Sequence, residues 1–275
     1  MALTVTLGAV ILATSGDAKV EDVEIDEDQP LAGVDNPVIH VPARVPGDHV
    51  KLLLVGDSGA AEWGPTLVDT AERGDGVAAA FAAQISCSIA YADGPGRQPD
   101  GSVIDREPCG SARTDLWKRL VDEYAPNVVV YYLANVGFVE EHRLDGHWVP
   151  ECDARYGRYL TDALADEAAL LTAGGADLVV ATSPYTATMQ VGSKDEVDCR
   201  NAGYRRFAAD HPGTQVVDLN AFVASQIPLT DASMFSDAVH LSKEGSRRAS
   251  RWLLPQIEEW YGCSAPNPRP KNCNT

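Results

Sequence analysis

The side chains that could carry chemistry in this chain lie in two stretches far apart in the sequence. Ser58 lies in Gly56-Asp57-Ser58-Gly59, while Asp237 and His240 are three residues apart near the other end. A serine hydroxyl becomes a nucleophile when a histidine takes its proton, and a carboxylate on the other ring nitrogen fixes the tautomer. These residue types predict acyl transfer through a serine, with Ser58, Asp237 and His240 as the catalytic group.

The residues around Ser58 suggest how that hydroxyl is presented. Five of the six residues from Val50 to Val55 are apolar, which is typical of a buried parallel strand, and a helix-compatible segment follows the turn. A serine there stands at the carboxyl edge of a sheet and near the positive end of a helix. The alternative is an ordinary strand-to-helix turn that the serine caps.

Apolar strand-like runs alternate with amphipathic helix-like runs from Val50 onward. The expected strands are Val50–Gly56, Gly76–Ala83, Asn127–Ala134, Ala176–Ser183 and Thr214–Leu219. The expected helices are Ala60–Arg73, Ala112–Tyr124, Ala154–Ala173, Arg200–His211 and Lys243–Trp260, the last opened by Ser242. This alternation predicts an α/β fold, a three-layer α/β/α flavodoxin-like domain with about five parallel strands.

Open parallel sheets bind ligands beyond the carboxyl ends of their strands, so polar residues that follow strands are candidates for the site. Ser86 comes just after the second expected strand, and Asn135 ends the third apolar run. The side-chain amide of Asn135 could donate to the oxyanion that forms during acyl transfer. Trp148, in a polar stretch with Gly146 and His147, could contact a sugar ring and is a candidate for substrate binding.

Composition excludes one class of partner. The formal net charge is −18, and nucleic acid needs a clustered basic surface, so no nucleic-acid partner is expected. The hydrophobic fraction of 45% is enough for a sizeable core. No metal or organic cofactor is implied.

The cysteines bear on the compartment. Six are present, none as a C-x-x-C pair, and an even count at wide spacing is typical of an oxidising compartment. Sequence does not choose among the possible pairings; a sequential pattern is our guess, with Cys87–Cys109, Cys152–Cys199 and Cys263–Cys273. The alternative is six reduced thiols in a cytosolic protein.

The first part of the chain differs in character from the rest. Residues 1–16 form an apolar segment, which could be an atypical signal peptide, the tail of a membrane span or a short anchor. Residues 17–48 are acidic and proline-rich and predict an extended linker, so the folded domain is expected over residues 49–275. Each interpretation of the apolar segment places the domain outside the cytoplasm, secreted or membrane-anchored.

Three short blocks resemble a known family. Gly56-Asp57-Ser58, an asparagine after the third strand, and Asp237-x-x-His240-Leu241-Ser242-x-x-Gly245 together resemble the SGNH (GDSL) hydrolase superfamily. The resemblance is greatest to the C-terminal SGNH domain of bacterial membrane-bound acyltransferases that O-acetylate cell-surface polysaccharides. In that group the first block often continues as in Ala60-Ala61-Glu62-Trp63, and a cysteine follows the second strand, as Cys87 does here.

The resemblance implies a role for each matching residue. Ser58 matches the nucleophile, His240 the base and Asp237 its partner, while Ser58, Ser86 and Asn135 occupy the oxyanion positions. The chain departs from the family pattern in three places. It has Ser86 near the position of the second-block glycine, Leu133-Ala134-Asn135-Val136 where Gly-x-Asn-Asp is usual, and Gly59 where the fused acyltransferases commonly have histidine.

Three functions remain open on this basis. The first is a serine acyltransferase or esterase acting on O-acetyl groups of cell-envelope polysaccharide, with an acyl ester and a polysaccharide acceptor as partners. A membrane acyltransferase domain is a further partner that this interpretation allows. The second is a stand-alone secreted esterase or lipase-like hydrolase. The third is a catalytically weakened carbohydrate-binding module.

The other histidines have no matching partner in the sequence and are expected on the surface or in packing. They are His40, His49, His142, His147 and His211.

Overall fold

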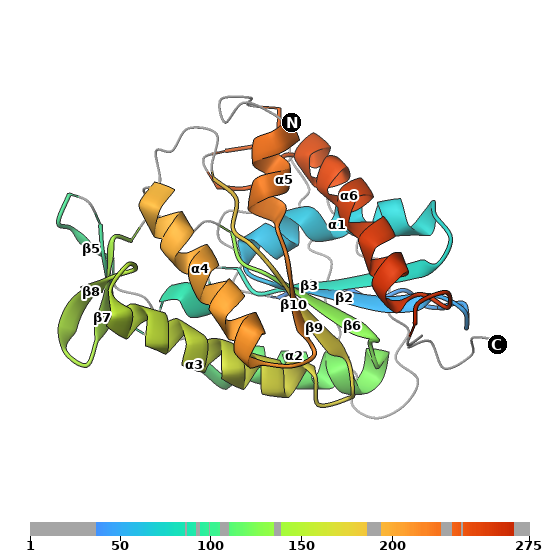
Figure 1. Ribbon diagram of the computed structural model, residues 1–275, viewed down its shortest axis with the longest axis horizontal. Coiled ribbons are helices and arrows are strands. Elements are labelled where there is room, and N and C mark those ends of the chain that lie inside the picture. Colours follow the sequence, from blue (N-terminus) through green and yellow to red (C-terminus); the bar gives the residue numbers. More distant parts are fainter. Residues whose placement is uncertain are drawn as a thin grey trace, which may run out of the picture.

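The main sheet has six strands, and five of them run parallel (Figure 1). The computed structural model describes residues 37–85, 87–91, 94–98, 100–104, 110–134, 139–185, 194–226, 233–237 and 239–266. The strand order is β1-β3-β2-β6-β9-β10, with β1 antiparallel at the edge. The strands are β1 (Val38–His40), β2 (Val50–Gly56), β3 (Val77–Ala83), β6 (Val128–Tyr132), β9 (Asp177–Ala181) and β10 (Thr214–Val217). The five parallel strands follow the flavodoxin-like order, which confirms the predicted fold class.

Helices cover both faces of this sheet. They are α1 (Ser58–Glu72), α2 (Gly110–Tyr124), α3 (Ala154–Leu171), α4 (Lys194–Asp210), α5 (Leu219–Gln226) and α6 (Lys243–Tyr261), with a short 3-10 helix η1 at Ile89–Tyr91. One core cluster joins the sheet to α1, α5 and α6, and a second joins it to α2, α3 and α4. Strand β2 shows why its sequence is a continuous apolar run, because Leu52 and Leu54 belong to the first cluster and Leu53 and Val55 to the second.

The structure adds elements that the sequence did not predict. The helix expected from Arg200 begins at Lys194, and α5 was not expected at all. Strand β1 lies inside the predicted linker and pairs with β3 from Val38↔Ala83 to His40↔Phe81, so the linker expectation is wrong for these three residues. Residues 1–36, which hold the apolar segment and most of that linker, lie outside the described residues.

A second, smaller sheet is formed by two connections between elements of the main fold. Its order is β5-β4-β7-β8, with bounds β4 (Gly96–Arg97), β5 (Val103–Ile104), β7 (Glu141–Leu144) and β8 (His147–Pro150). Strands β4 and β5 lie between β3 and α2, and β7 and β8 lie between β6 and α3. Asp145 and Gly146 join β7 to β8 with φ of 48° and 78°, which is the backbone twist that a two-residue hairpin turn needs.

One disulfide fastens two helices of the main fold. Cys152, just before α3, is bonded to Cys199 in α4 across a Cα–Cα distance of 5.3 Å, which confirms this part of the sequential pairing. Cys87 and Cys263 are disulfide-bonded as well. Their expected partners, Cys109 and Cys273, lie outside the described residues. In the part of the chain that the structure describes, no helix combines the length and the apolar character that crossing a membrane requires.

Candidate active site

Ser58 is the first residue of α1, directly beyond the end of β2. Asp57 is the N-cap of that helix, so the alternative in which the serine caps the turn is wrong. Close packing dictates the glycines on either side. A Cβ on Gly56 would lie 1.8 Å from the carbonyl oxygen of Tyr132, and one on Gly59 would lie 2.8 Å from side-chain atoms of Tyr132 and Ala134. The departure from the family at Gly59 therefore has a local steric reason.

Asp57 ties the serine turn to the neighbouring strand. Its Oδ1 accepts hydrogen bonds from the backbone N–H of Gly59 at 2.9 Å and of Ala134 at 3.0 Å. The side chain is buried, and burial raises the pKa of Asp57 against the lowering effect of those two N–H groups. Because Ala134 lies two residues after the end of β6, Asp57 fixes the exit of β6 next to Ser58.

His240 and Asp237 come from a tight loop before α6. The loop is closed by an antiparallel bridge between Phe235 and Leu241 and by a hydrogen bond from Ser236 N to His240 O at 3.0 Å. Ser242 caps α6 through its Oγ, which accepts from Gly245 N at 3.0 Å, as the sequence predicted. The three-residue spacing thus places both side chains on one turn.

The three predicted catalytic side chains form one hydrogen-bonded chain. His240 Nε2 lies 2.8 Å from Ser58 Oγ, and His240 Nδ1 lies 2.7 Å from Asp237 Oδ2. The other carboxylate oxygen of Asp237 accepts from the backbone N–H of Val239 and of His240, each at 2.7 Å. A neutral imidazole with its proton on Nδ1 fits this arrangement, since Nε2 is then free to accept the hydroxyl proton.

The hydrogen bonds around Asp237 favour the charged form of its carboxylate. Partial burial of Asp237 acts to raise its pKa, but the hydrogen bonds from the His240 ring and from the two backbone N–H groups hold that pKa below its ordinary value. The Asp237 side chain is 54% exposed and that of His240 is 21% exposed, so the site is open on the aspartate side.

Glu62 is a neighbour of this group that the sequence did not single out. It lies four residues after Ser58, on the same face of α1. Burial and the nearby negative charge of Asp237 raise the pKa of Glu62, and a favourable interaction with His240 acts against that rise. The i,i+4 spacing from the candidate nucleophile is the signal that could have identified it.

The remaining predicted site residues are not gathered at Ser58 by the described structure. Ser86 and Asn135, the expected oxyanion residues, lie outside the described residues. Trp148 lies on β8 of the second sheet, partly buried, with the guanidinium carbons of Arg97 and Arg143 each 5.1 Å from its ring centroid.

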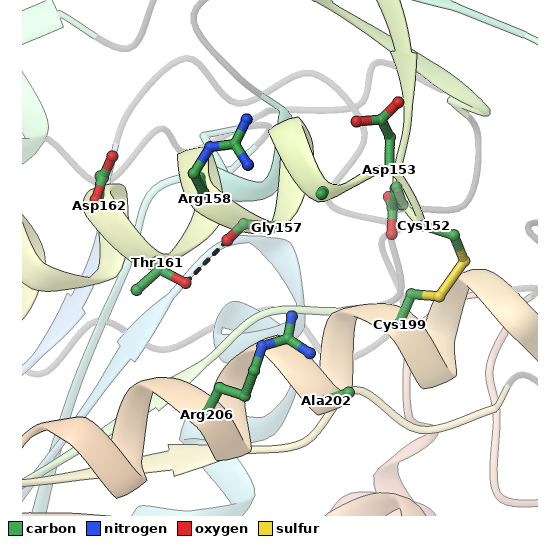
Figure 2. A pocket seen from close by; sticks show the side chains of 11 residues that line it. Cys152, Asp153, Gly157, Arg158, Thr161, Asp162, Cys199, Ala202 and Arg206 are labelled. Carbon is green, nitrogen blue, oxygen red and sulfur yellow. Dashed lines mark hydrogen bonds between the residues drawn. A yellow bond between two sulfur atoms is a disulfide. The ribbon is translucent and has the colours of Figure 1, made fainter.

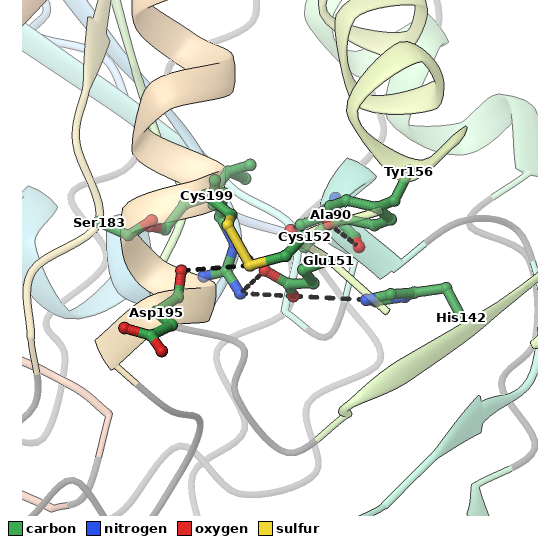
Figure 3. Close-up of polar contacts among 11 residues, drawn as sticks. Ala90, His142, Glu151, Cys152, Tyr156, Ser183, Asp195 and Cys199 are labelled. Carbon is green, nitrogen blue, oxygen red and sulfur yellow. Dashed lines mark hydrogen bonds and ion pairs between the residues drawn. A yellow bond between two sulfur atoms is a disulfide. The ribbon is translucent and has the colours of Figure 1, made fainter. Parts of the chain in front are cut away.

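A buried charged cluster was also missed. Glu151 Oε1 lies 3.3 Å from His142 Nε2, and Arg200 donates to both carboxylate oxygens of Glu151, at 2.6 and 2.7 Å from Nη2. Burial acts to raise the pKa of Glu151, but Arg200 and His142 hold it below its ordinary value. Figure 3 shows His142 and Glu151 beside the Cys152–Cys199 disulfide. His142 is therefore a core residue with a carboxylate partner, which the sequence did not predict.

A groove lies between α3 and α4, away from the serine. Its volume is about 520 Å³, and its lining includes Thr161, Arg158 and Arg206 together with the disulfide. Figure 2 shows Arg206 of α4 pointing across the groove toward α3. None of Ser58, Asp237 and His240 is among the described residues that line it.

A parallel sheet that presents a serine at a strand-to-helix turn, beside a histidine and an aspartate from one loop, defines an α/β serine hydrolase. The chain belongs to the SGNH family: the model described as SGNH domain (fused to AT3 domains) matches residues 27–255. No similar sequence is found among the curated proteins.

Solved structures that are similar to this chain come from several bacteria. A lipase/acylhydrolase from Enterococcus faecalis is 17% identical, with 76% of this chain and 95% of that chain covered and a TM-score of 0.50. A putative acylhydrolase from Bacteroides fragilis NCTC 9343 is 15% identical over 76% and 86% of the two chains, with a TM-score of 0.48. The C-terminal catalytic domain of Streptococcus pneumoniae peptidoglycan O-acetyltransferase A is 14% identical over 76% and 93%, with a TM-score of 0.44. At 17% identity, the likeness to the Enterococcus faecalis structure shows the fold alone.

Proposed function

We propose that this protein is an extracytoplasmic serine enzyme that moves or removes O-acetyl groups on cell-envelope polysaccharide through an acyl-serine intermediate. The observation that carries the proposal is the hydrogen-bonded chain from Ser58 through His240 to Asp237. The family supports acyl chemistry as the reaction type, because its SGNH domains are described as fused to AT3 domains. A membrane acyltransferase domain is accordingly the proposed partner.

The first half of the reaction forms the acyl-enzyme. Ser58 Oγ attacks the ester carbonyl while His240 Nε2 takes the hydroxyl proton, and Asp237 stabilises the resulting imidazolium. The backbone N–H of Ser58, the N–H at Ser86 and the side-chain amide of Asn135 are the proposed donors to the oxyanion, and one such donor is worth about 2.7–4 kcal/mol in other enzymes. The alcohol then leaves with the proton from His240, and the acyl group stays on Ser58.

The second half decides between transfer and hydrolysis. His240 takes a proton from a sugar hydroxyl or from water, the new oxygen attacks the acyl carbon, and Ser58 regains its proton. Product that appears only when glycan is supplied supports transfer. Acetate released at the same rate with and without glycan supports the stand-alone esterase. Neither half requires a cofactor in this scheme.

The proposed location outside the cytoplasm is supported by the disulfides. Cys152, Cys199, Cys87 and Cys263 are all in the oxidised form, which persists in secreted and surface proteins and is rare in the cytosol. Counting free thiols in the protein purified from its native compartment under denaturing conditions tests this, and six free thiols would contradict it.

The nucleophile is tested by Ser58→Ala. We expect hydrolysis of p-nitrophenyl acetate to fall by about 10³-fold or more, because removal of the nucleophile leaves only binding and oxyanion stabilisation. Ser225→Ala, an exposed serine of α5, is the matched control and should keep the wild-type rate. A fluorophosphonate should label Ser58 in the wild type.

Two results would contradict this assignment. The nucleophile is wrong if Ser58→Ala hydrolyses the ester at the wild-type rate. Glycan binding by a protein that neither turns over ester nor reacts with fluorophosphonate would instead favour the carbohydrate-binding module.

A further inference from the structure

The second sheet lies at the same edge of the fold as Ser58. Its strands come from the connections that follow β3 and β6, and these two strands flank β2, which leads to Ser58. Parallel strands end at a common edge, so both insertions leave the main sheet on either side of the candidate nucleophile. Figure 1 shows β5, β7 and β8 standing out at one side of the molecule.

The two faces of this sheet have different characters. His142 and Val149 point inward and are fully buried. The cross-strand pairs Arg97↔Val103, Arg97↔Glu141 and Arg143↔Trp148 lie on the opposite face, because paired residues share a side and side chains alternate along each strand. We call the side formed by Arg97, Val103, Glu141, Arg143 and Trp148 the outer face.

The outer face carries an indole ring and two guanidinium groups held together. The guanidinium carbons of Arg97 and Arg143 are each 5.1 Å from the Trp148 ring centroid, within range of cation–π attraction. Val103 adds an apolar side chain that is 55% exposed, the only exposed large hydrophobic residue in the described part of the chain. A partly exposed aromatic ring with guanidinium donors beside it is suited to a sugar ring and its substituents.

The charges on this face distinguish its two arginines. Arg97 forms an ion pair with Glu141. Arg143 is exposed, and no carboxylate of the described residues lies within ion-pair distance of it. A guanidinium with no carboxylate partner among the described residues, beside a tryptophan, favours a ligand that brings its own negative charge.

The inner face holds this surface in place. His142 of β7 contacts Glu151, which is paired with Arg200 of α4. Cys152 follows Glu151 and Cys199 precedes Arg200, and these two cysteines are joined by the disulfide. Figure 3 shows His142, Glu151, Cys152 and Cys199 and the contacts among them. The backbone of β7 and the end of β8 are thus anchored to the main fold, which lowers the ordering cost of binding.

We propose that the outer face binds an acidic glycan strand, with Trp148 against a sugar ring and Arg143 pairing with a carboxylate or phosphate on the strand. This rests on the proposed function, because it names the class of acceptor that reaches Ser58. The glycan lies across the second sheet, and a hydroxyl further along the strand enters the acyl-serine site.

Binding is measured apart from chemistry by using Ser58→Ala as the parent protein. Hexagalacturonate supplies carboxylates, a phosphorylated mannopentaose supplies phosphate, and cellohexaose is the neutral probe. Calorimetry at 50 mM salt should show at least one acidic probe binding ten times or more tightly than cellohexaose. That affinity should fall by tenfold or more at 0.5 M salt, because an ion pair on an exposed surface is screened.

Variants of the Ser58→Ala parent test whether the probes bind at the outer face. Trp148→Ala and Arg143→Gln should each weaken acidic-probe binding by tenfold or more, with thermal unfolding used to confirm that they fold. Arg119→Gln, an exposed arginine of α2, is the matched control and should bind as the parent does. Arg143→Lys, which keeps the charge, should restore part of the affinity.

Three outcomes would overturn the proposal. They are equal binding of the neutral probe, unchanged affinity in folded Trp148→Ala and Arg143→Gln, and no binding of either acidic probe at millimolar concentration. The last result would be expected if this face docks a protein partner instead. The proposed function is judged separately by small-ester hydrolysis in proteins that retain Ser58, so it can survive any of these failures.

Discussion

Replacing Asp237 by asparagine should disable the site while preserving its shape. Asp237 Oδ1 accepts two backbone N–H bonds at 2.7 Å, so the amide oxygen of an asparagine must take that position. Its NH₂ group then faces His240 Nδ1, which can only accept from it. The ring proton moves to Nε2, where it points at Ser58 and prevents the ring from acting as a base.

The size of this effect follows from the same contacts. Rotating the introduced amide by 180° would break its two hydrogen bonds from the backbone N–H groups of Val239 and His240, each worth about 0.5–1.5 kcal/mol. The tautomer of His240 with its proton on Nε2 is therefore favoured by about 1–3 kcal/mol. Loss of the carboxylate also removes stabilisation of the imidazolium that forms during attack. The corresponding change in a serine protease costs about 10⁴ in kcat, equivalent to about 5.4 kcal/mol of barrier. We expect a fall of about 10³–10⁴ in kcat for Asp237→Asn.

The assay is steady-state hydrolysis of p-nitrophenyl acetate, with circular dichroism to confirm the fold. Asp122→Asn makes the same isosteric change at an exposed position of α2 and should keep the wild-type kcat. A folded Asp237→Asn enzyme within tenfold of the wild-type kcat would refute the tautomer argument and remove Asp237 from the catalytic group.

Three further predictions concern packing, charge and cross-linking. Gly59→Ala should lower activity and destabilise by about 1–3 kcal/mol in urea unfolding, because its Cβ would lie 2.8 Å from side chains at the end of β6; unchanged stability would contradict the close packing. Glu62→Gln should raise the melting temperature at pH 8 and have little effect near pH 4. The raised pKa of Glu62 means that its ionised form is disfavoured by folding, so the wild type loses stability as the pH rises above the ordinary value of 4.5; a gain independent of pH would contradict this. The double variant Cys152→Ser/Cys199→Ser should lose about 4 kcal/mol, the chain-entropy value for residues 47 apart, and a loss under 1 kcal/mol in chemical denaturation would show that the reduced chain is already constrained.

The elements that the sequence predicted are those with strong local signals. The apolar run of β2, the glycine-flanked turn at Ser58 and the Ser242 cap each depend on residues within a few positions of one another. Asp237 and His240 were paired correctly in space because both lie on a single turn. The contact of His240 with Ser58 followed from topology, since both residues were placed at the carboxyl edge of one parallel sheet.

The elements that the sequence missed depend on distant partners or are too short for periodicity. Strand β1 has three residues in an acidic, proline-rich stretch, and only its pairing with β3 makes it a strand. Strands β4 and β5 have two residues each. The hairpin of β7 and β8 did carry a local signal, the Asp145-Gly146 dipeptide, which is a strong two-residue turn motif. The contact of His142 with Glu151 has no such signal.

The long sequence separation between Ser58 and His240 has a consequence during biosynthesis. Ser58 belongs to the first helix and His240 to the segment before the last, and their helices are joined by a buried bond from Trp63 Nε1 to Ser250 Oγ at 2.9 Å. A nascent chain that has not yet been made as far as residue 240 therefore holds a serine without its histidine. The proposed acyl-serine chemistry requires α1 and α6 to have docked, so a half-made chain does not yet hold the complete site.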